Sequence, residues 1–172
     1  ATAGRRAAVS FVSQNGLLTS LSMPFDAAGS SGAARLYTYK KFANGMYGIT
    51  QIRNPMGGVD LVTYQERALP YGNNAYLPAV QIWERQPQAG QPSIVTRYAY
   101  SPTKNFTGNP IPGGFAPGVD NLYKNSGSYE YWCEARTIDP DNGNATLAVT
   151  TTTYNKFHLM ISQVRQQGTA TK

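Results

Sequence analysis

Short runs in which hydrophobic and polar residues alternate recur along most of the chain. In residues 93–100, for example, every second position would lie on one side of a strand: Ile94, Thr96, Tyr98 and Tyr100. A period of two is that of a β-strand, and no segment shows a sustained helical period with helix caps. The pattern predicts strands within residues 7–13, 17–23, 35–42, 46–52, 59–67, 76–85, 93–100, 130–138, 145–154 and 156–164.

Turn residues separate these runs. Asn15-Gly16, the stretch Ala43–Gly45 and the segment at 86–92 lie between neighbouring runs, and such turns connect antiparallel strands. We therefore expect one all-β domain over residues 1–172, folded as an antiparallel sandwich or barrel; a jelly roll would fit the same pattern.

The segment Ser101–Gly127 is the exception to this spacing. It contains Pro102, three further prolines and Gly113-Gly114, and long loops of this kind are usually functional. Its apolar residues are too many for a loop that faces only solvent. We expect these side chains to make contacts between subunits as a contact arm: Phe106, Ile111, Phe115, Val119 and Leu122.

The stretch Asp139–Asn144, with the sequence DPDNGN, has acidic residues two positions apart, as calcium loops do. Counted from Asp139, however, Gly143 is the fifth residue and Thr150 the twelfth, whereas an EF-hand requires Gly at the sixth and Glu at the twelfth. A hairpin fits better, because Asn142-Gly143 is a turn signal and threonines follow it as a strand. We expect no metal site here.

Little in the sequence indicates an enzyme. Cys133 and His158 are the only residues of their types, so a cysteine-based or histidine-rich zinc site is excluded and any nucleophile–histidine pair would have to use His158. His158 falls within the last predicted strand, where we expect no catalytic role. The nine carboxylates are scattered, and we interpret Glu66-Arg67 and Glu84-Arg85 as charge pairs at strand ends. We expect no catalytic residues and no cofactor.

Tyrosines and basic residues suggest a binding face. Charged residues make up only 14% of the chain and the net charge is +6, while 12 tyrosines stand against 6 phenylalanines. Rings beside Arg and Lys on a sheet can stack bases or sugars and neutralise phosphate, although the same rings often only cover a core. The candidate face consists of Arg35, Tyr37, Tyr39, Lys41, Arg97, Tyr98 and Tyr100.

These features favour a self-assembling structural subunit. A polar surface of low charge opposes self-association weakly, and a virion coat, tail or decoration protein that forms homo-oligomeric shells or filaments would use both the contact arm and the positive charge. Any contact with nucleic acid would come from a folded face. The alternative is a secreted or surface-attached carbohydrate-binding module of the adhesin type. No apolar run reaches the ~20 residues of a membrane span.

Overall fold

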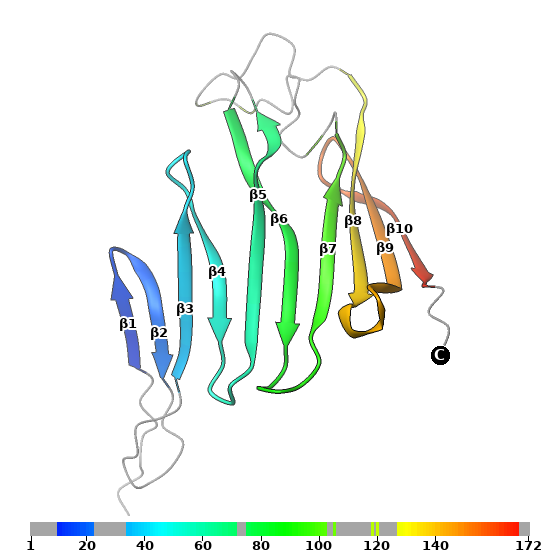
Figure 1. The fold of residues 1–172 in the computed structure, drawn as a ribbon. Coiled ribbons are helices and arrows are strands. Elements are labelled where there is room, and N and C mark those ends of the chain that lie inside the picture. The colour runs from blue at the N-terminus through cyan, green and yellow to red at the C-terminus, as the bar shows by residue number, and fades with distance from the viewer. Residues whose placement is uncertain are drawn as a thin grey trace, which may run out of the picture.

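The computed structural model describes residues 10–22, 34–71, 75–102, 105, 118, 120 and 127–168. They form one antiparallel sheet in which the strands lie in chain order, so that each inner strand pairs with the strand before it and the strand after it (Figure 1). The ten strands are β1 (Ser10–Gln14), β2 (Leu17–Ser22), β3 (Ala34–Lys41), β4 (Tyr47–Arg53), β5 (Val59–Tyr71), β6 (Ala75–Gln86), β7 (Ile94–Tyr100), β8 (Glu130–Asp139), β9 (Ala145–Asn155) and β10 (Met160–Gln167).

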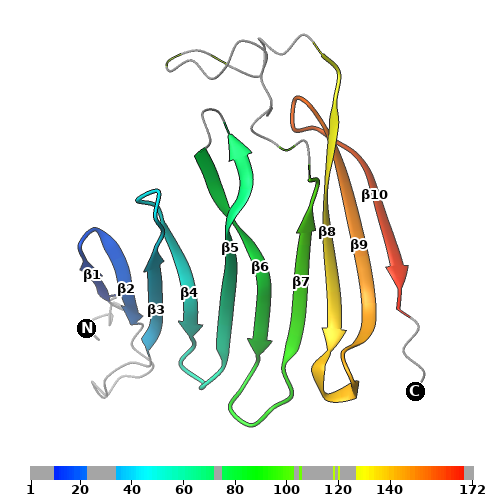
Figure 2. The same cartoon turned by 45° about the horizontal axis from the view of Figure 1, so that its top comes forward.

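The all-β class and the antiparallel pairing are confirmed, and each expected run overlaps one strand. The layering differs from a sandwich or a barrel, because the described strands form a single open sheet with β1 and β10 as its edges (Figures 1 and 2). Alternation along a strand reports that its two faces differ, but it does not report what covers each face. A single open sheet whose two faces differ therefore has the same sequence pattern as a sheet in a sandwich.

Asp139–Asn144 is a hairpin turn, as expected. Pro140–Asn142 form one turn of 3-10 helix between β8 and β9, and the Asp139 carboxylate accepts a hydrogen bond of 3.1 Å from the Asp141 backbone N–H. Gly143 follows with a φ of 59°, in the left-handed region that favours glycine.

His158 lies in a turn, which corrects the expectation that it belongs to a strand. The Asn155 N–H donates to the Leu159 carbonyl at 3.0 Å and the His158 N–H donates to the Asn155 carbonyl at 3.0 Å, so the chain reverses here and β10 begins only at Met160. His158 has a φ of 63°. The expectation failed because this turn contains neither Gly nor Pro.

Very little of the described sheet is buried. Its buried hydrophobic residues are few, and no side chain in the described part is fully enclosed: the buried ones are Phe42, Leu69, Ala79, Val95 and Ile138. Val95 and Ile138 are register partners on β7 and β8. One layer of strands has no second layer to pack against, which accounts for the small core.

The contact arm at 101–127 lies mostly outside the described residues, and so do all five of its expected contact residues: Phe106, Ile111, Phe115, Val119 and Leu122. Within the described part, no helix is long and apolar enough to cross a membrane.

Candidate functional site

The pairing register places most aromatic rings of the sheet on one side, which we call the aromatic face. Residues directly opposite each other in neighbouring strands share a face, and alternation extends that assignment along each strand. Three successive register pairs place residues of β3 to β6 on the same face: Tyr37–Ile52, Ile52–Asp60 and Asp60–Arg85. Further pairs extend this face to β9. The rings on this face include Phe11, Tyr37, Tyr39, Tyr47, Tyr64, Trp83, Tyr98, Tyr100, Tyr131 and Tyr154.

Several of these rings are anchored through their polar atoms. The Tyr39 hydroxyl donates to the Leu18 carbonyl at 2.8 Å, and the Tyr100 hydroxyl donates to the Val80 carbonyl at 2.7 Å. The Trp83 indole N–H donates to Asp60 at 3.2 Å. The rings therefore lie along the sheet and cover its backbone, which fixes their orientation.

Burial raises the pKa of several side chains on this face, and nearby titratable groups raise it further. Burial raises the pKa of Tyr131 to about 12, with smaller contributions from Tyr129 and Tyr154. Burial also raises the pKa of Tyr100 and of the Cys133 thiol. These groups stay protonated near neutral pH, so Cys133 has the character of a half-buried thiol and not of an activated nucleophile.

The structure divides the predicted binding residues between two faces. Arg35, Tyr37, Tyr39 and Lys41 alternate along β3 on the aromatic face, and Tyr98 and Tyr100 share that face on β7. Arg97 lies on the opposite face, where it pairs with Ile82 and Arg136. Strands β3 and β7 are four spacings apart, about 19 Å, so the two groups of rings do not form one compact site.

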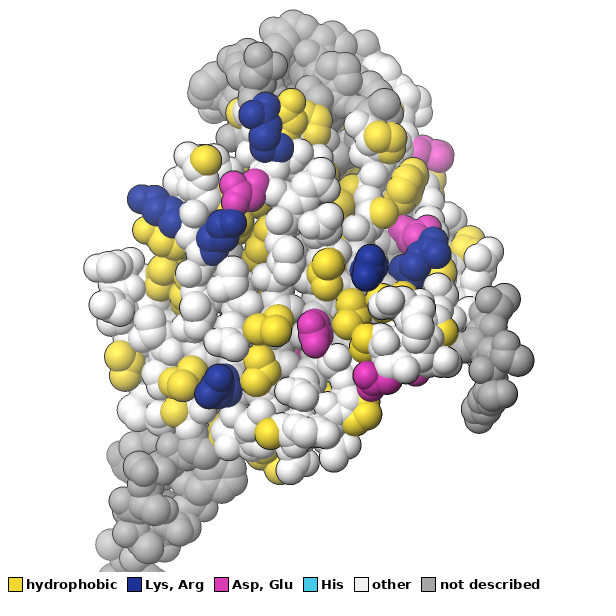
Figure 3. All heavy atoms as spheres, in the orientation of Figure 1, with side chains coloured by type: hydrophobic (Ala, Val, Ile, Leu, Met, Phe, Trp, Pro, Cys, Tyr) yellow, Lys and Arg dark blue, Asp and Glu magenta, His cyan; other side chains and the backbone are white. Residues whose placement is uncertain are grey.

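The opposite side, which we call the charged face, carries Glu84, Arg97, Glu134 and Arg136. Figure 3 shows one face of the molecule, on which side chains of both charges are spread across the sheet and hydrophobic side chains form small separate groups. Arg136 and Glu134 form an ion pair at 3.0 Å. Such exposed pairs contribute little to stability, and a mixture of both signs offers no continuous positive strip for a polyanion.

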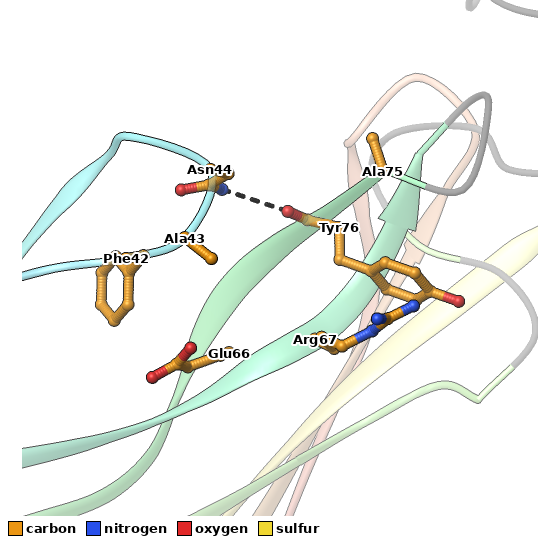
Figure 4. A pocket seen from close by; sticks show the side chains of 7 residues that line it. All are labelled: Phe42, Ala43, Asn44, Glu66, Arg67, Ala75 and Tyr76. Atoms are coloured by element: carbon orange, nitrogen blue, oxygen red, sulfur yellow. Dashed lines mark hydrogen bonds between the residues drawn. The ribbon is translucent and has the colours of Figure 1, made fainter.

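A cavity of about 310 Å³ lies between the β3–β4 turn and the far end of the β5–β6 hairpin (Figure 4). The Asn44 side-chain amide bridges its two walls by donating to the Tyr76 carbonyl at 3.1 Å. The Arg67 guanidinium stacks 4.3 Å from the centre of the Tyr76 ring, and Glu66 forms an ion pair with Lys40 across the wall. An aromatic ring beside amide, carboxylate and guanidinium groups is chemistry that suits a small polar ring.

No pattern in the sequence predicts this cavity, because its walls come from segments more than 20 residues apart in the chain. The sequence suggested charge pairs between Glu66 and Arg67 and between Glu84 and Arg85. In the structure Glu66 pairs with Lys40, and Arg85 pairs with Asp60 at 3.1 Å. Phe42 is one of the residues that line this cavity. Its ring packs edge-on against Tyr64 at 5.1 Å, and a Cβ on Gly48 would lie only 2.8 Å from it, so only glycine fits there.

A second cluster joins β8, β9 and the turn before β10. Tyr131 stacks on Tyr154 with ring centres 5.2 Å apart, and the Tyr131 hydroxyl lies 2.8 Å from the Nδ1 of His158. The neighbouring cavity, about 170 Å³, is mainly apolar and is lined by Leu69, Tyr100, Ser101, Asn105, Tyr131, Trp132 and Cys133. The Tyr131 hydroxyl thus holds the Nδ1 of the imidazole.

The described residues contain no group of three or more His, Cys, Asp or Glu side chains that could hold a metal ion. The chain was compared with protein-family models, with curated proteins and with solved structures, and none of them matches it.

Proposed function

We propose that this chain is a structural subunit that assembles with copies of itself, with a virion coat, tail or decoration protein as the setting that its composition favours. The observation that carries the proposal is the single layer of described strands, which leaves large hydrophobic side chains exposed.

The small core leads to the same inference. Domains bury the apolar side of a sheet against a second layer, and among the described strands that layer is missing. Large hydrophobic side chains stay exposed on several strands, Phe11, Leu36, Leu61 and Trp132 among them. A second copy is the partner that is always present when this chain is made.

The charge pattern bears on the contact with nucleic acid. The net charge of +6 comes without a long Lys/Arg run, and the described basic residues are divided between both faces. If the subunit encloses a genome, the contact therefore involves separate folded positions such as Arg35 and Lys41, and its salt dependence will be modest.

The test is the mass and shape of the purified protein. We expect light scattering after size-exclusion chromatography to give a defined multiple of the chain mass, and negative-stain microscopy to show closed or filamentous particles. A folded protein that remains monomeric at high concentration would contradict the proposal.

The alternative function is carbohydrate binding, and the cavity beside Tyr76 favours it. Protein–sugar contacts combine an aromatic surface with planar polar side chains, and Tyr76, Asn44 and Glu66 bring these together. Screening on a glycan array, followed by calorimetry, tests this function. Binding that is lost in Tyr76→Ala and kept in Tyr47→Ala, which alters a ring outside the cavity, would establish it.

A further inference from the structure

Strand β10 is an open edge of the described sheet. Among the described strands it pairs with β9 alone, and all eight of its residues are exposed. The backbone N–H and C=O groups on the outer side of an edge strand are a template for another strand. This edge is therefore a surface whose chemistry fits an extended backbone.

The other edge of the described sheet, β1, is interrupted by a bulge along its described length. Natural sheets blunt their edges with bulges, lysines and prolines. The register of β1 with β2 shifts between Val12 and Ser13. In β10 the shift lies at the start of the strand, between Met160 and Ser162, and the register is unbroken from Ser162 to Gln167. Strand β10 contains Arg165 as its only charge and no proline.

The side chains of β10 add an apolar component to this edge. Met160, Ile161 and Val164 are 59%, 48% and 52% exposed. Burial of an apolar side chain contributes favourably to association, whereas long exposed edges with apolar residues are rare in proteins that stay monomeric.

We propose that β10 pairs in antiparallel orientation with β10 of a second copy about a two-fold axis, so that two sheets become one. This inference rests on the proposed self-assembly and specifies its partner surface. The second copy fits better than an unrelated peptide because the edge is self-complementary. With the axis at Val164, this valine faces Val164 of the second copy, and Arg165 faces Gln163.

Neighbouring registers are less favourable. An axis at Arg165 would place two guanidinium groups directly opposite each other, and like charges in this position destabilise a strand pair. An axis at Gln163 would bring the shifted register between Met160 and Ser162 into the pairing, whereas an axis at Val164 centres it on residues 162–166 of the unbroken part.

Disulfide cross-linking tests the pairing, in a Cys133→Ala background that removes the natural thiol. Residues opposite each other at the axis have Cα atoms about 4.5–5.5 Å apart, within the range that a disulfide spans. We expect Val164→Cys to give covalent dimers in most chains on mild oxidation. The matched control is Val12→Cys on β1, whose valine is 55% exposed and which should stay monomeric on a denaturing gel.

The register has its own test. Ser162→Cys alone should not cross-link, because the two copies of residue 162 would lie about 13 Å apart. The double variant Ser162→Cys/Gln166→Cys should cross-link as efficiently as Val164→Cys, because these positions face each other.

A charge variant separates this inference from the proposed function. Val164→Lys places two ammonium groups at the axis and should abolish the β10 contact, whereas Val12→Lys should not. If the unmodified protein is an oligomer, but Val164→Cys gives no cross-link and Val164→Lys leaves its mass unchanged, the edge pairing is wrong and self-assembly stands. If the unmodified protein is a monomer, both fail.

Discussion

The turn at residues 54–58 and the turn at residues 155–159 have the same backbone and very different sequences. In each, the first residue is an asparagine whose N–H donates to the carbonyl four residues later, at 2.9 Å in the first turn and 3.0 Å in the second. The side-chain oxygens of Asn54 and Asn155 each accept from two backbone N–H groups within their own turn. The fourth position is left-handed in both, and it is Gly57 in one and His158 in the other.

The difference shows which part of a turn is determined by the chain itself and which by its surroundings. The asparagine and its hydrogen bonds are present in both turns, so they are the part of the turn that the local sequence determines. The last position is Gly58 in the first turn and Leu159 in the second. Gly58 is buried beside the β6–β7 connection, whereas Leu159 lies at the edge of the sheet and is 63% exposed.

The largest effect is expected at these last positions. A Cβ on Gly58 would collide with the carbonyl oxygen of Pro87, which is backbone and cannot turn aside. We expect Gly58→Ala to lower the free energy of unfolding by about 3 kcal/mol, because overpacking would force the two connections apart. Leu159→Ala, its counterpart, should change it by less than about 0.5 kcal/mol. Urea unfolding at a fixed protein concentration measures both, and equal effects would show that the surroundings do not matter.

The asparagines should differ by a smaller amount. Each loses two hydrogen bonds on change to alanine, but the Gly58 N–H that Asn54 accepts from is partly buried, whereas both donors to Asn155 are exposed. We expect Asn54→Ala to cost about 2 kcal/mol and Asn155→Ala about 1 kcal/mol, because a donor left without water loses more. Asn44→Ala is not a suitable control, since it also breaks the contact with Tyr76.

The smallest effect concerns the left-handed position. Gly57→Ala should destabilise the protein by about 1 kcal/mol, because alanine tolerates positive φ poorly. His158→Gly relieves the same strain but loses the contact with Tyr131, so its net effect should be near zero. In a Tyr131→Phe background the hydrogen bond is already absent and only the edge-on ring contact remains, so there His158→Gly should stabilise by up to about 1 kcal/mol. Thermal unfolding of the unmodified protein and these three variants closes the double-mutant cycle.

The sequence predicted the strands well, because each strand alternates and most turns contain Gly, Asn or Pro. The turn at 155–159 was missed, since Lys156, Phe157 and His158 have the character of strand residues, and the reversal depends on hydrogen bonds to Asn155 that no Gly or Pro announces. The single layer was missed because alternation says nothing of the neighbour across a face. The Tyr76 cavity was missed because it depends on how far β5 and β6 extend beyond β4.

The order of the strands has a consequence for how the chain folds. Every described strand pairs only with its neighbours in the sequence, so most of the pairing is local, and the connection between Tyr100 and Glu130 is the longest step. During synthesis each strand has its partner available as soon as it is made, and the sheet grows one hairpin at a time. Strand β10 is the tenth to be made, so its edge is presented only when the other nine strands exist. Growth of the sheet would thus precede association, and the exposure of unfinished edges to other chains would be brief.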